Sequence, residues 1–435
     1  MKQPMNIIYV ICHDLGRELG CYGKPIQTPV LDSFAKESAL FTNAYCSSPA
    51  CSPSRGCGMT GMYAHTNGLM GIVGTGWSLD VNVKTVVDYL NDAGYETVHT
   101  GHQHERIRNE DNRYQIEMLN ETADQFVENA ISQAIGYLSS RKEGDRPFYL
   151  NIGTSEVHTG TWMTQSENTA PRRAIYGTTP ETEIYMPPYI IDTPELRNEM
   201  GSFQACIRYF DNQLKRLFDA VTALGYENDT LVIFTTDHGI SNERAKGSLY
   251  GAGIEISLMA RLPGVINPGT VIDNLIQNID LAPTILEAAG IDIPESMQGK
   301  SFWSLMTGNP YMEHQELFLE RNYHGQRGYD PMRAVRTKNY HYILNFDKDA
   351  KRSWLPDETP NISKTYQNWF TELWPKNRPD RDRAELFDLT TDPLEFHNIA
   401  KDPKMQSICE ELRAKVDLWM KKTSDPLLQG RVPHP

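Results

Sequence analysis

The 435-residue sequence predicts an α/β fold, with a doubly wound, mostly parallel sheet flanked by helices and a smaller α+β domain after it. Short apolar runs rich in β-branched residues alternate with amphipathic helical patterns from residue 6 to about residue 300. Continuous apolar runs of this kind are typical of strands buried on both faces of a parallel sheet. The pattern changes after about residue 325, so we expect domains at 1–325 and 326–435.

The predicted strands of the first domain are separated by helical patterns. Asn6–Cys12 is the clearest buried strand, because all but its first residue are apolar. The other expected strands are Leu40–Cys46, Tyr95–Thr100, Phe148–Gly153 and Leu231–Thr235. Proline at the first helical position supports two of the helix starts, since its missing N–H would be unpaired there. The expected helices are those opening at Thr28-Pro29 and Thr193-Pro194, together with Gly56–Met62, Val83–Asn91, Thr122–Ser140 and Leu281–Ala289.

The second domain is predicted from three segments. Met332–Phe346 alternates like an edge strand, and Glu385–Leu389 begins a further segment after a loop rich in Trp, Pro and Arg. Met405–Trp419 has the apolar spacing of a terminal amphipathic helix. Together these segments predict a small α+β domain that packs on the first.

Charge and composition exclude several classes of function. A net charge of −14 argues against nucleic acid as a partner, and it means that an anionic ligand needs a local basic cluster. The seven cysteines contain no CxxC pair, so we expect no disulfide framework. No apolar run approaches 18 residues, which predicts no membrane span. The start of the chain fits a cytoplasmic protein if it is native, and a periplasmic or secreted one if a signal peptide has been removed.

Polar side chains follow four of the predicted strands. Because the carboxyl ends of parallel strands meet at one edge of a sheet, we expect these side chains to lie close together. Carboxylates and imidazoles are both metal ligands, and imidazoles are also acid–base groups at neutral pH. The residues concerned are His13 and Asp14, His102 and His104, His158, and Asp237 and His238.

The segment Ser47–Gly61 contains the pattern Cys-x-Pro-x-Arg, from Cys51 to Arg55. Taken alone, this pattern is also compatible with a turn that holds a small buried thiol. It is the sequence that a modifying enzyme reads when it oxidises cysteine to formylglycine, and here the chain resembles the type I sulfatase family. Asp14 and the Asp237-His238-Gly239 segment stand where that family has metal-binding residues, and Lys246 stands where a lysine contacts the sulfate group.

The resemblance covers most of the chain and implies an alkaline-phosphatase-like fold. It is closest to the heparan N-sulfatase branch. The stretches that carry it are Asn228–Thr235, Pro331–Arg333, Glu385–Asp388 with Asp392-Pro393, Asn398–Ala400 with Asp402-Pro403, and Thr423–Pro426. It implies hydrolysis of sulfate from a sulfated sugar, either N-sulfoglucosamine or an O-sulfated glycan unit. The implied partners are the sulfated carbohydrate and a formylglycine-generating or anaerobic sulfatase-maturating enzyme.

The same resemblance implies the roles of individual residues. Arg55 would orient the formylglycine hydrate, His104 would take its proton, and His158 or Lys246 would assist the leaving group. The catalytic candidates are Cys51, Arg55, His102, His104, His158 and Lys246, and the metal-site candidates are His13, Asp14, Cys51, Asp237 and His238. The candidates for binding a carboxylate or second sulfate of the sugar are Arg321, His324 and Arg333, which could also be ordinary surface charges.

Two residues depart from the family pattern. His13 stands where the family has an aspartate, and His102 stands where it has a lysine. Imidazole is a poor ligand for Ca²⁺, so Mg²⁺ or Mn²⁺ is an alternative to the Ca²⁺ that the resemblance implies. Two other functions stay open: a phosphonate or phosphate monoester hydrolase of the same superfamily, and a catalytically impaired relative that binds glycans.

Overall fold

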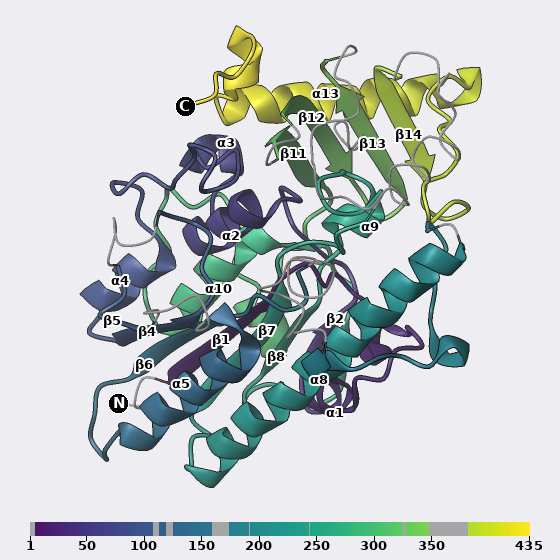
Figure 1. Ribbon diagram of the computed structural model, residues 1–435. Helices are drawn as coiled ribbons and strands as arrows, with labels where there is room; N and C mark the ends of the chain where they lie inside the picture. The colour runs from purple at the N-terminus through teal and green to yellow at the C-terminus, as the bar shows by residue number, and fades with distance from the viewer. Residues whose placement is uncertain are drawn as a thin grey trace.

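An eight-stranded sheet forms the centre of the computed structural model, which describes residues 5–107, 113–118, 125–158, 174–190, 192–242, 244–324, 328–347 and 382–435. The strand order is β5-β4-β6-β1-β7-β8-β2-β9, and only β8 runs antiparallel to its neighbours (Figure 1). The strands are β1 (Asn6–Cys12), β2 (Ala39–Phe41), β4 (Glu96–Gly101), β5 (Ile116–Met118), β6 (Phe148–Gly153), β7 (Thr230–Thr236), β8 (Leu258–Arg261) and β9 (Thr270–Ile272).

Helices cover both faces of this sheet (Figure 1). One face is covered by α1 (Pro29–Lys36), α5 (Val127–Ser140) and α8 (Pro194–Ala223). The other is covered by α2 (Cys51–Thr60), α4 (Val86–Asp92) and α10 (Leu281–Ala288). Shorter helices are α3 (Ala64–Asn67), α9 (Gly251–Ile254) and α11 (Trp303–Met306), and β3 (Ala44–Tyr45) pairs with β10 (Ile276–Gln277).

The central strand β1 shows why the sheet is buried on both sides. Ile7 and Tyr9 belong to the core under α4 and α10, whereas Ile8 and Val10 belong to the core under α5 and α8. Successive side chains of a strand point to opposite faces, so a strand covered on both faces needs an apolar residue at every position. The predicted fold class is confirmed by this two-sided sheet.

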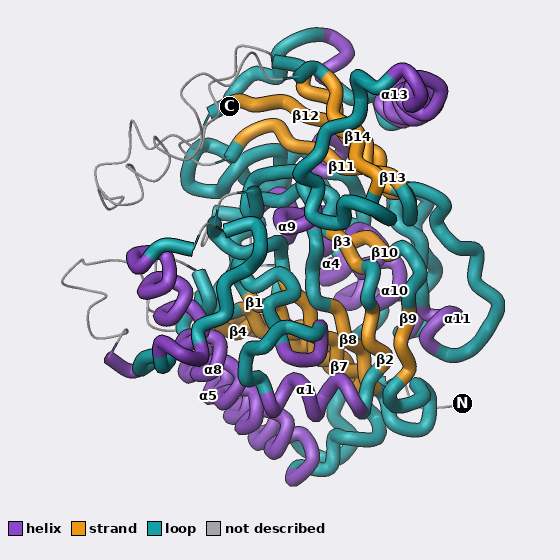
Figure 2. Tube along the Cα trace, turned by 90° about the vertical axis from the view of Figure 1, so that its right-hand side faces the viewer, coloured by secondary structure: helices purple, strands orange, loops and turns teal. Residues whose placement is uncertain are grey.

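A second, antiparallel sheet lies beside the first and carries the C-terminal helix (Figure 1). Its strands are β11 (Leu317–Tyr323), β12 (Tyr329–Arg336), β13 (Tyr340–Asn345) and β14 (Ala384–Asp388). Helix α13 (Gln406–Lys422) is seen nearly end-on beside these strands in Figure 2 and packs its apolar side on them. Because β11 begins at Leu317, this sheet starts before residue 325, and the two-domain division stays a prediction.

Two predicted strands are wrong in extent. Leu40–Cys46 is not one strand, because β2 and β3 belong to different sheets and the chain turns at Thr42-Asn43 between them. Met332–Phe346 spans a hairpin of β12 and β13, closed at Thr337 by its N–H donating to the Tyr340 carbonyl at 2.8 Å. Polar turn residues interrupt the apolar alternation in both segments, and this interruption marks where one strand ends and the next begins.

The helix expected at Gly56–Met62 begins earlier, at Cys51. Pro53 is compatible with this start because the first helical N–H groups have no intrahelical partner. Residues 122–124 of the helix predicted at Thr122–Ser140 and the Trp-, Pro- and Arg-rich loop at 348–381 lie outside the described residues. Among the described residues, no helix is both long enough and apolar enough to cross a membrane.

Candidate active site

The strands predicted to end in polar residues are neighbours in the sheet, in the order β4-β6-β1-β7. Their parallel pairing brings the ends into register, with Ile11 opposite Gly153 and Cys12 opposite Thr236. The residues after these strands therefore emerge at one edge of the sheet, as expected for a ligand site of an open α/β fold.

Asp14 and Asp237 form a buried carboxylate pair at this edge. The backbone N–H of Asp14 donates to Asp237 Oδ1 at 2.9 Å, and Lys246 Nζ lies 2.9 and 2.7 Å from the two carboxylate oxygens of Asp14. Asp14 adopts a left-handed backbone conformation, with φ of 53°, which is strained for a residue with a Cβ. The hydrogen bonds to Asp237 and Lys246 stabilise this strained conformation, in which the Asp14 carboxylate lies within the cluster.

Cys51 is the first residue of α2 and faces the carboxylate pair. Its Sγ lies 3.4 Å from His238 Nε2 and 4.0 Å from Asp14 Oδ1. One turn later, Arg55 Nε donates to Asp237 Oδ2 at 3.1 Å. Both Nη atoms of Arg55 are buried, and neither has a hydrogen-bond partner among the described residues. A buried guanidinium with two unused donors is suited to a bound oxyanion.

The segment leading into Cys51 is held by a residue that sequence reasoning missed. Asn278 Oδ1 accepts from both the N–H and the Oγ of Ser47, at 2.9 and 2.7 Å. Its Nδ2 donates to the carbonyl of Ser54 at 2.9 Å and to the Ser54 hydroxyl at 3.0 Å. One amide therefore bridges the loop before α2 and the first turn of the helix. No local motif marks Asn278, since it lies about 230 residues away along the chain.

A group of imidazoles lines the same edge of the sheet. The His13 ring centroid lies 5.1 Å from that of His102, 6.3 Å from that of His104 and 4.6 Å from that of His158. His13 Nδ1 donates to Asp14 Oδ1 at 2.7 Å, and His158 Nε2 lies 3.7 Å from the other oxygen of Asp14. The structure thus brings together all the histidines predicted from the strand ends.

Opposite charges set the ionisation of the cluster. Burial would raise the pKa of the Cys51 thiol, but Lys246, His13 and His238 hold it well below its ordinary value. Burial likewise opposes ionisation of Asp14 and Asp237, and the neighbouring cations hold both pKa values below the ordinary range. The side chains around Cys51 therefore form a local basic cluster, which an anionic ligand needs in a protein with a net charge of −14.

The histidines differ strongly in basicity. Burial lowers the pKa of His13, but Cys51, Asp237 and Asp14 outweigh it and raise that pKa to about 9. For His158, burial and the charge of Lys246 lower the pKa to about 3. Burial and the charges of His13 and Arg55 also hold the pKa of His102 well below its ordinary value. At neutral pH the metal-free cluster therefore contains both charged and neutral imidazoles.

The three predicted substrate-binding residues occupy two different environments. Arg321 Nη1 donates to the Gly247 carbonyl at 2.6 Å, and the His324 ring packs against Gly247, so both lie beside the Lys246 loop. Arg333 is fully buried, and its guanidinium is bound by both carboxylate oxygens of Asp425. The structure places Arg333 inside the small domain, where it ties β12 to the C-terminal segment.

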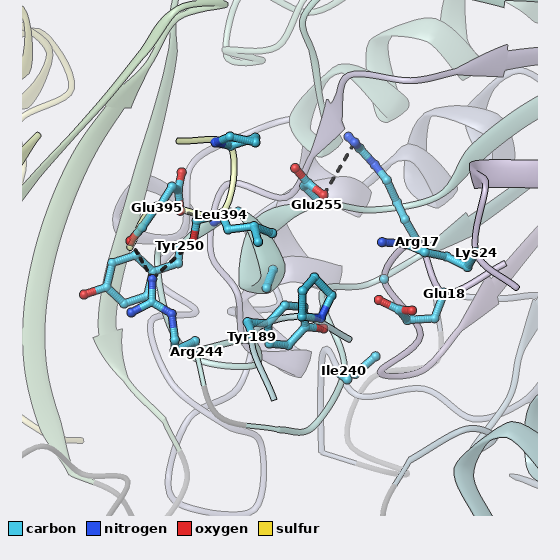
Figure 3. A pocket seen from close by; sticks show the side chains of 16 residues that line it. Arg17, Glu18, Lys24, Tyr189, Ile240, Arg244, Tyr250, Glu255, Leu394 and Glu395 are labelled. Atoms are coloured by element: carbon cyan, nitrogen blue, oxygen red, sulfur yellow. Dashed lines mark hydrogen bonds and ion pairs between the residues drawn. The ribbon is translucent and has the colours of Figure 1, made fainter. Parts of the chain in front are cut away.

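A separate pocket lies next to this site, where the 393–395 segment meets the first domain (Figure 3). Its charged side chains are mostly paired with one another or with the backbone. Arg17 Nη1 lies 3.6 Å from Glu255 Oε2, and Arg244 Nη2 donates to the Glu395 carbonyl at 2.6 Å. None of the residues that line it belongs to the cluster around Cys51. We therefore interpret the pocket as a gap where the 393–395 segment packs on the first part of the chain, and not as part of the active site.

The donor set of the cluster fits a divalent metal ion. One ligand atom from each of five residues lies within 4.8 Å of the others, and those residues are His13, Asp14, Cys51, Asp237 and His238. His238 Nδ1 donates to the Gly239 carbonyl at 2.9 Å, which leaves Nε2 facing the cluster as a ligand. Two carboxylates and two imidazoles form a mixed oxygen and nitrogen set that differs from the all-oxygen sets typical of Ca²⁺.

The chain matches the sulfatase family over residues 5–291 and the C-terminal region of N-sulphoglucosamine sulphohydrolase over residues 237–368. It is 29% identical to an ulvan-active sulfatase of Formosa agariphila, across 100% of this chain and 84% of the relative. It is 28% identical to human N-sulphoglucosamine sulphohydrolase, across 98% of this chain and 91% of the relative.

A solved structure of a protein in complex with its substrate D-glucosamine-2-N,6-O-disulfate has the same fold, with a TM-score of 0.75 and 19% identity. The match covers 97% of this chain and 99% of that one. The family match extends over well more than half of the chain and includes Cys51, Arg55 and the Asp14–Asp237 pair. The chain therefore belongs to the sulfatase family and is a sulfuric ester or sulfamate hydrolase.

Proposed function

We propose that this protein removes sulfate from an N-sulfoglucosamine or O-sulfated glycan unit, with Cys51 converted to formylglycine and a divalent metal at the neighbouring carboxylates. The observation that carries the proposal is the buried cluster in which Cys51 Sγ lies close to Asp14 and His238, while both Nη atoms of Arg55, one helical turn later, have no partner among the described residues. Relatives that act on N-sulfated glucosamine and on ulvan support a sulfated sugar as the substrate.

Asp14, Asp237 and His238 would hold the metal, with His13 at its margin. When bound, a divalent metal supplies positive charge that polarises a sulfate oxygen and lowers the pKa of a coordinated hydroxyl. Two imidazoles in the donor set favour Mn²⁺ over Ca²⁺ among the ions that suit carboxylates. Hydrated formylglycine would supply a hydroxyl to attack sulfur and a second hydroxyl through which the sulfated intermediate can collapse to the aldehyde.

Side chains of the protein would bind the oxyanion, accept a proton and stabilise the leaving group. Arg55 would direct its two free Nη donors to the oxyanion beside Cys51, in a geometry that its ion pair with Asp237 keeps rigid. His104, whose ring centroid lies 5.3 Å from that of His102 at the same edge of the sheet, would accept the proton released on collapse. Because the low pKa of His158 leaves it neutral at neutral pH, the charged Lys246 is the better group to stabilise the leaving alcohol or amine.

A panel of sulfated sugars tests the substrate. The protein would be produced with a sulfatase-maturating enzyme. Sulfate release would be measured on N- and O-sulfated glucosamine and on sulfated disaccharides, and release of the phenol would be measured on an aryl phosphonate. We expect sulfate release that is absent from a Cys51→Ala variant. Release from O-sulfated members alone would refute N-sulfatase activity, and faster turnover of the phosphonate would refute the sulfatase assignment of the substrate.

The modification has a test of its own. Mass analysis of the peptide that contains Cys51, from protein made with and without the maturating enzyme, reports the aldehyde directly. We expect formylglycine only with the maturating enzyme, and sulfate release in proportion to its fraction. Full activity in protein whose Cys51 is entirely thiol would contradict the formylglycine mechanism.

A further inference from the structure

Lys246 lies on a short loop whose two ends contact the same residue of the C-terminal region, Glu395. The loop runs from Arg244 to Gly251, which is the first residue of α9. The backbone carbonyl of Glu395 accepts from Arg244 Nη2 at 2.6 Å, and its carboxylate Oε2 accepts from the N–H of Gly251, also at 2.6 Å (Figure 3). A residue 151 positions after Arg244 in the chain therefore bridges both ends of the loop.

The backbone inside the loop is fixed relative to Arg244. The carbonyl of Arg244 accepts from Ser248 Oγ at 2.7 Å. The N–H of Gly247 donates to the Pro49 carbonyl at 2.7 Å, in the segment that leads into α2. Arg244 also has a left-handed backbone conformation, with φ of 56°, which is strained for a residue with a Cβ. Contacts of its side chain support that conformation, and Lys246 follows only two residues later.

Aromatic rings hold the Arg244 guanidinium together with the Glu395 carbonyl. Its central carbon lies 4.2 Å from the ring centroid of Tyr250, in the loop, and 4.9 Å from that of Phe396, in the C-terminal region. A planar guanidinium can lie over an aromatic face and donate hydrogen bonds at its edge at the same time. The Arg244 side chain therefore joins the lysine loop to residues 395 and 396.

Glu395 is a rigid anchor for this contact, since it is only 1% exposed. Its Oε1 accepts from Arg336 Nη1 at 2.9 Å and from His341 Nδ1 at 2.7 Å, which ties it to β12 and β13. Burial would raise the pKa of its carboxyl, but His341 and Arg336 lower that pKa to about 2. The carboxylate is therefore charged at neutral pH and accepts charge-assisted hydrogen bonds from both strands.

We propose that Arg244, anchored on Glu395, is a positioning residue that fixes Lys246 for catalysis. The inference rests on the proposed function, in which Lys246 stabilises the leaving alcohol or amine. Lys246 Nζ lies 2.9 and 2.7 Å from the two carboxylate oxygens of Asp14, at the end of a flexible four-carbon stem. The position of its charge therefore depends on where the loop holds its backbone, and a displacement of about 1 Å can lower a rate by about 100-fold.

Amide hydrogen exchange tests the positioning role without any substrate. Arg244→Ala removes the side-chain anchor and keeps the backbone hydrogen bonds of the loop. We expect the peptide that covers residues 244–251 to exchange about 10-fold faster or more, because a hydrogen bond from a charged donor stabilises the closed loop by at least that factor. Exchange in β12 and β13 should stay at the wild-type rate. Arg208→Ala is the matched control, since Arg208 Nη2 likewise donates to a backbone carbonyl, that of Thr178 at 3.0 Å.

Steady-state kinetics on the best substrate of the panel gives the second readout. Arg244→Ala should lower kcat by about 10- to 100-fold and change KM less, because a displaced lysine loses its contact mainly in the transition state. Arg244→Lys should restore part of this kcat, since an ammonium can still donate to the Glu395 carbonyl and lie over the Tyr250 ring. A contact that only stabilised the fold would lower the unfolding midpoint and leave kcat of the folded enzyme unchanged.

Three results would overturn the proposal. They are unchanged exchange of residues 244–251 in Arg244→Ala, a wild-type kcat in that variant, and exchange that rises equally across β12 and β13. The last result would show that Arg244 supports the small sheet and not the lysine loop. Because exchange is measured without substrate, a wild-type protein that releases no sulfate would refute the proposed function and leave the exchange test intact.

Discussion

The residues around Cys51 owe their chemistry to opposite charges packed together in a buried site. Asp237 alone accepts from the backbone N–H groups of Asp14 and His238, each at 2.9 Å, and from Arg55 Nε at 3.1 Å. Such contacts are strong because the surroundings have a low dielectric constant, and each broken contact leaves a buried group unpaired. Single substitutions here should therefore affect activity and metal binding, and those that leave a buried charge unpaired should also lower stability.

Replacing Arg55 with lysine keeps the charge and removes the planar fork. We expect Arg55→Lys to lower kcat for sulfate release by about 100-fold or more, since a lysine cannot offer two parallel donors to the oxyanion. The rate would be measured on the best substrate of the panel. Arg413→Lys, on the surface of α13, is the control and should keep the wild-type rate. Equal rates in both variants would show that the fork of Arg55 is not used.

Asp237→Asn tests the ligand set of the carboxylate site. The amide keeps an oxygen that can accept from the backbone, so we expect the fold to survive. The loss of a negative charge should weaken metal retention, and sulfate release should fall by about 10-fold or more with it. Metal content after dialysis against a chelator would be compared with that of the exposed control Asp92→Asn. Unchanged metal content and unchanged rate would remove Asp237 from the ligands.

At the scale of elements, the site depends on how closely the turn after β7 approaches α9. Gly239 follows Asp237 and His238, and a Cβ at this position would lie only 1.8 Å from the Ala252 carbonyl oxygen. Its N–H also donates to the Gly253 carbonyl at 3.0 Å. Only glycine permits this contact between two backbones, and the contact fixes the direction in which the preceding two side chains point.

Gly239→Ala should therefore force β7 and α9 apart. We expect a loss of about 1–3 kcal/mol in the free energy of unfolding, together with a large loss of activity. Gly136→Ala is the matched control, because a Cβ there meets nothing within 4 Å inside α5. That control should be neutral or stabilising by up to about 1 kcal/mol. Denaturant unfolding measures both, and an unchanged midpoint for Gly239→Ala would contradict the close approach.

Over the whole molecule, β11 joins the small sheet to the catalytic edge. The N–H of Glu320 donates to the Ser47 carbonyl at 2.8 Å, just before the Cys51 loop. Its buried carboxylate accepts from His65 Nδ1 at 2.9 Å and lies 3.9 Å from Arg333 Nη2. The antiparallel sheet is thus tied to the segment before Cys51 and to α3 through a charged network. The loop before α2 gains support from both halves of the chain.

This network predicts how stability depends on pH. Burial would raise the pKa of Glu320, but His65 and Arg333 lower it from 4.5 to about 2. A carboxylate whose pKa is lowered by folding contributes its full stabilisation at pH values above the pKa that it has in the unfolded chain. The stabilisation, about 3 kcal/mol here, is lost as the pH falls from about 5 to about 2.

Acid unfolding of a Glu320→Gln variant measures this contribution. The variant should be less stable than the wild type at pH 7, and its stability should depend less on pH between about 5 and 2. Glu295→Gln, at an exposed position, should follow the wild-type curve. Parallel curves for Glu320→Gln and the wild type would show that Glu320 does not carry the acid sensitivity.

The sequence by itself was sufficient to identify the buried parallel strands, the residues at their ends and the family. These features are local: a strand covered on both faces needs an uninterrupted apolar run, and the Cys51–Arg55 motif lies within five residues. Strand extents were harder to predict, since the breaks at Thr42-Asn43 and near Thr337 depend on which sheet each half joins.

Only the tertiary structure decided how these residues work together. The bridge made by Asn278, the burial of Arg333 against Asp425, and the convergence of His102 and His104 on His13 all join positions far apart in the chain. No periodicity or motif records such contacts, because they arise from strand order and from packing between layers. The sequence determined the set of chemical groups, and the order of β4, β6, β1 and β7 decided which of them meet.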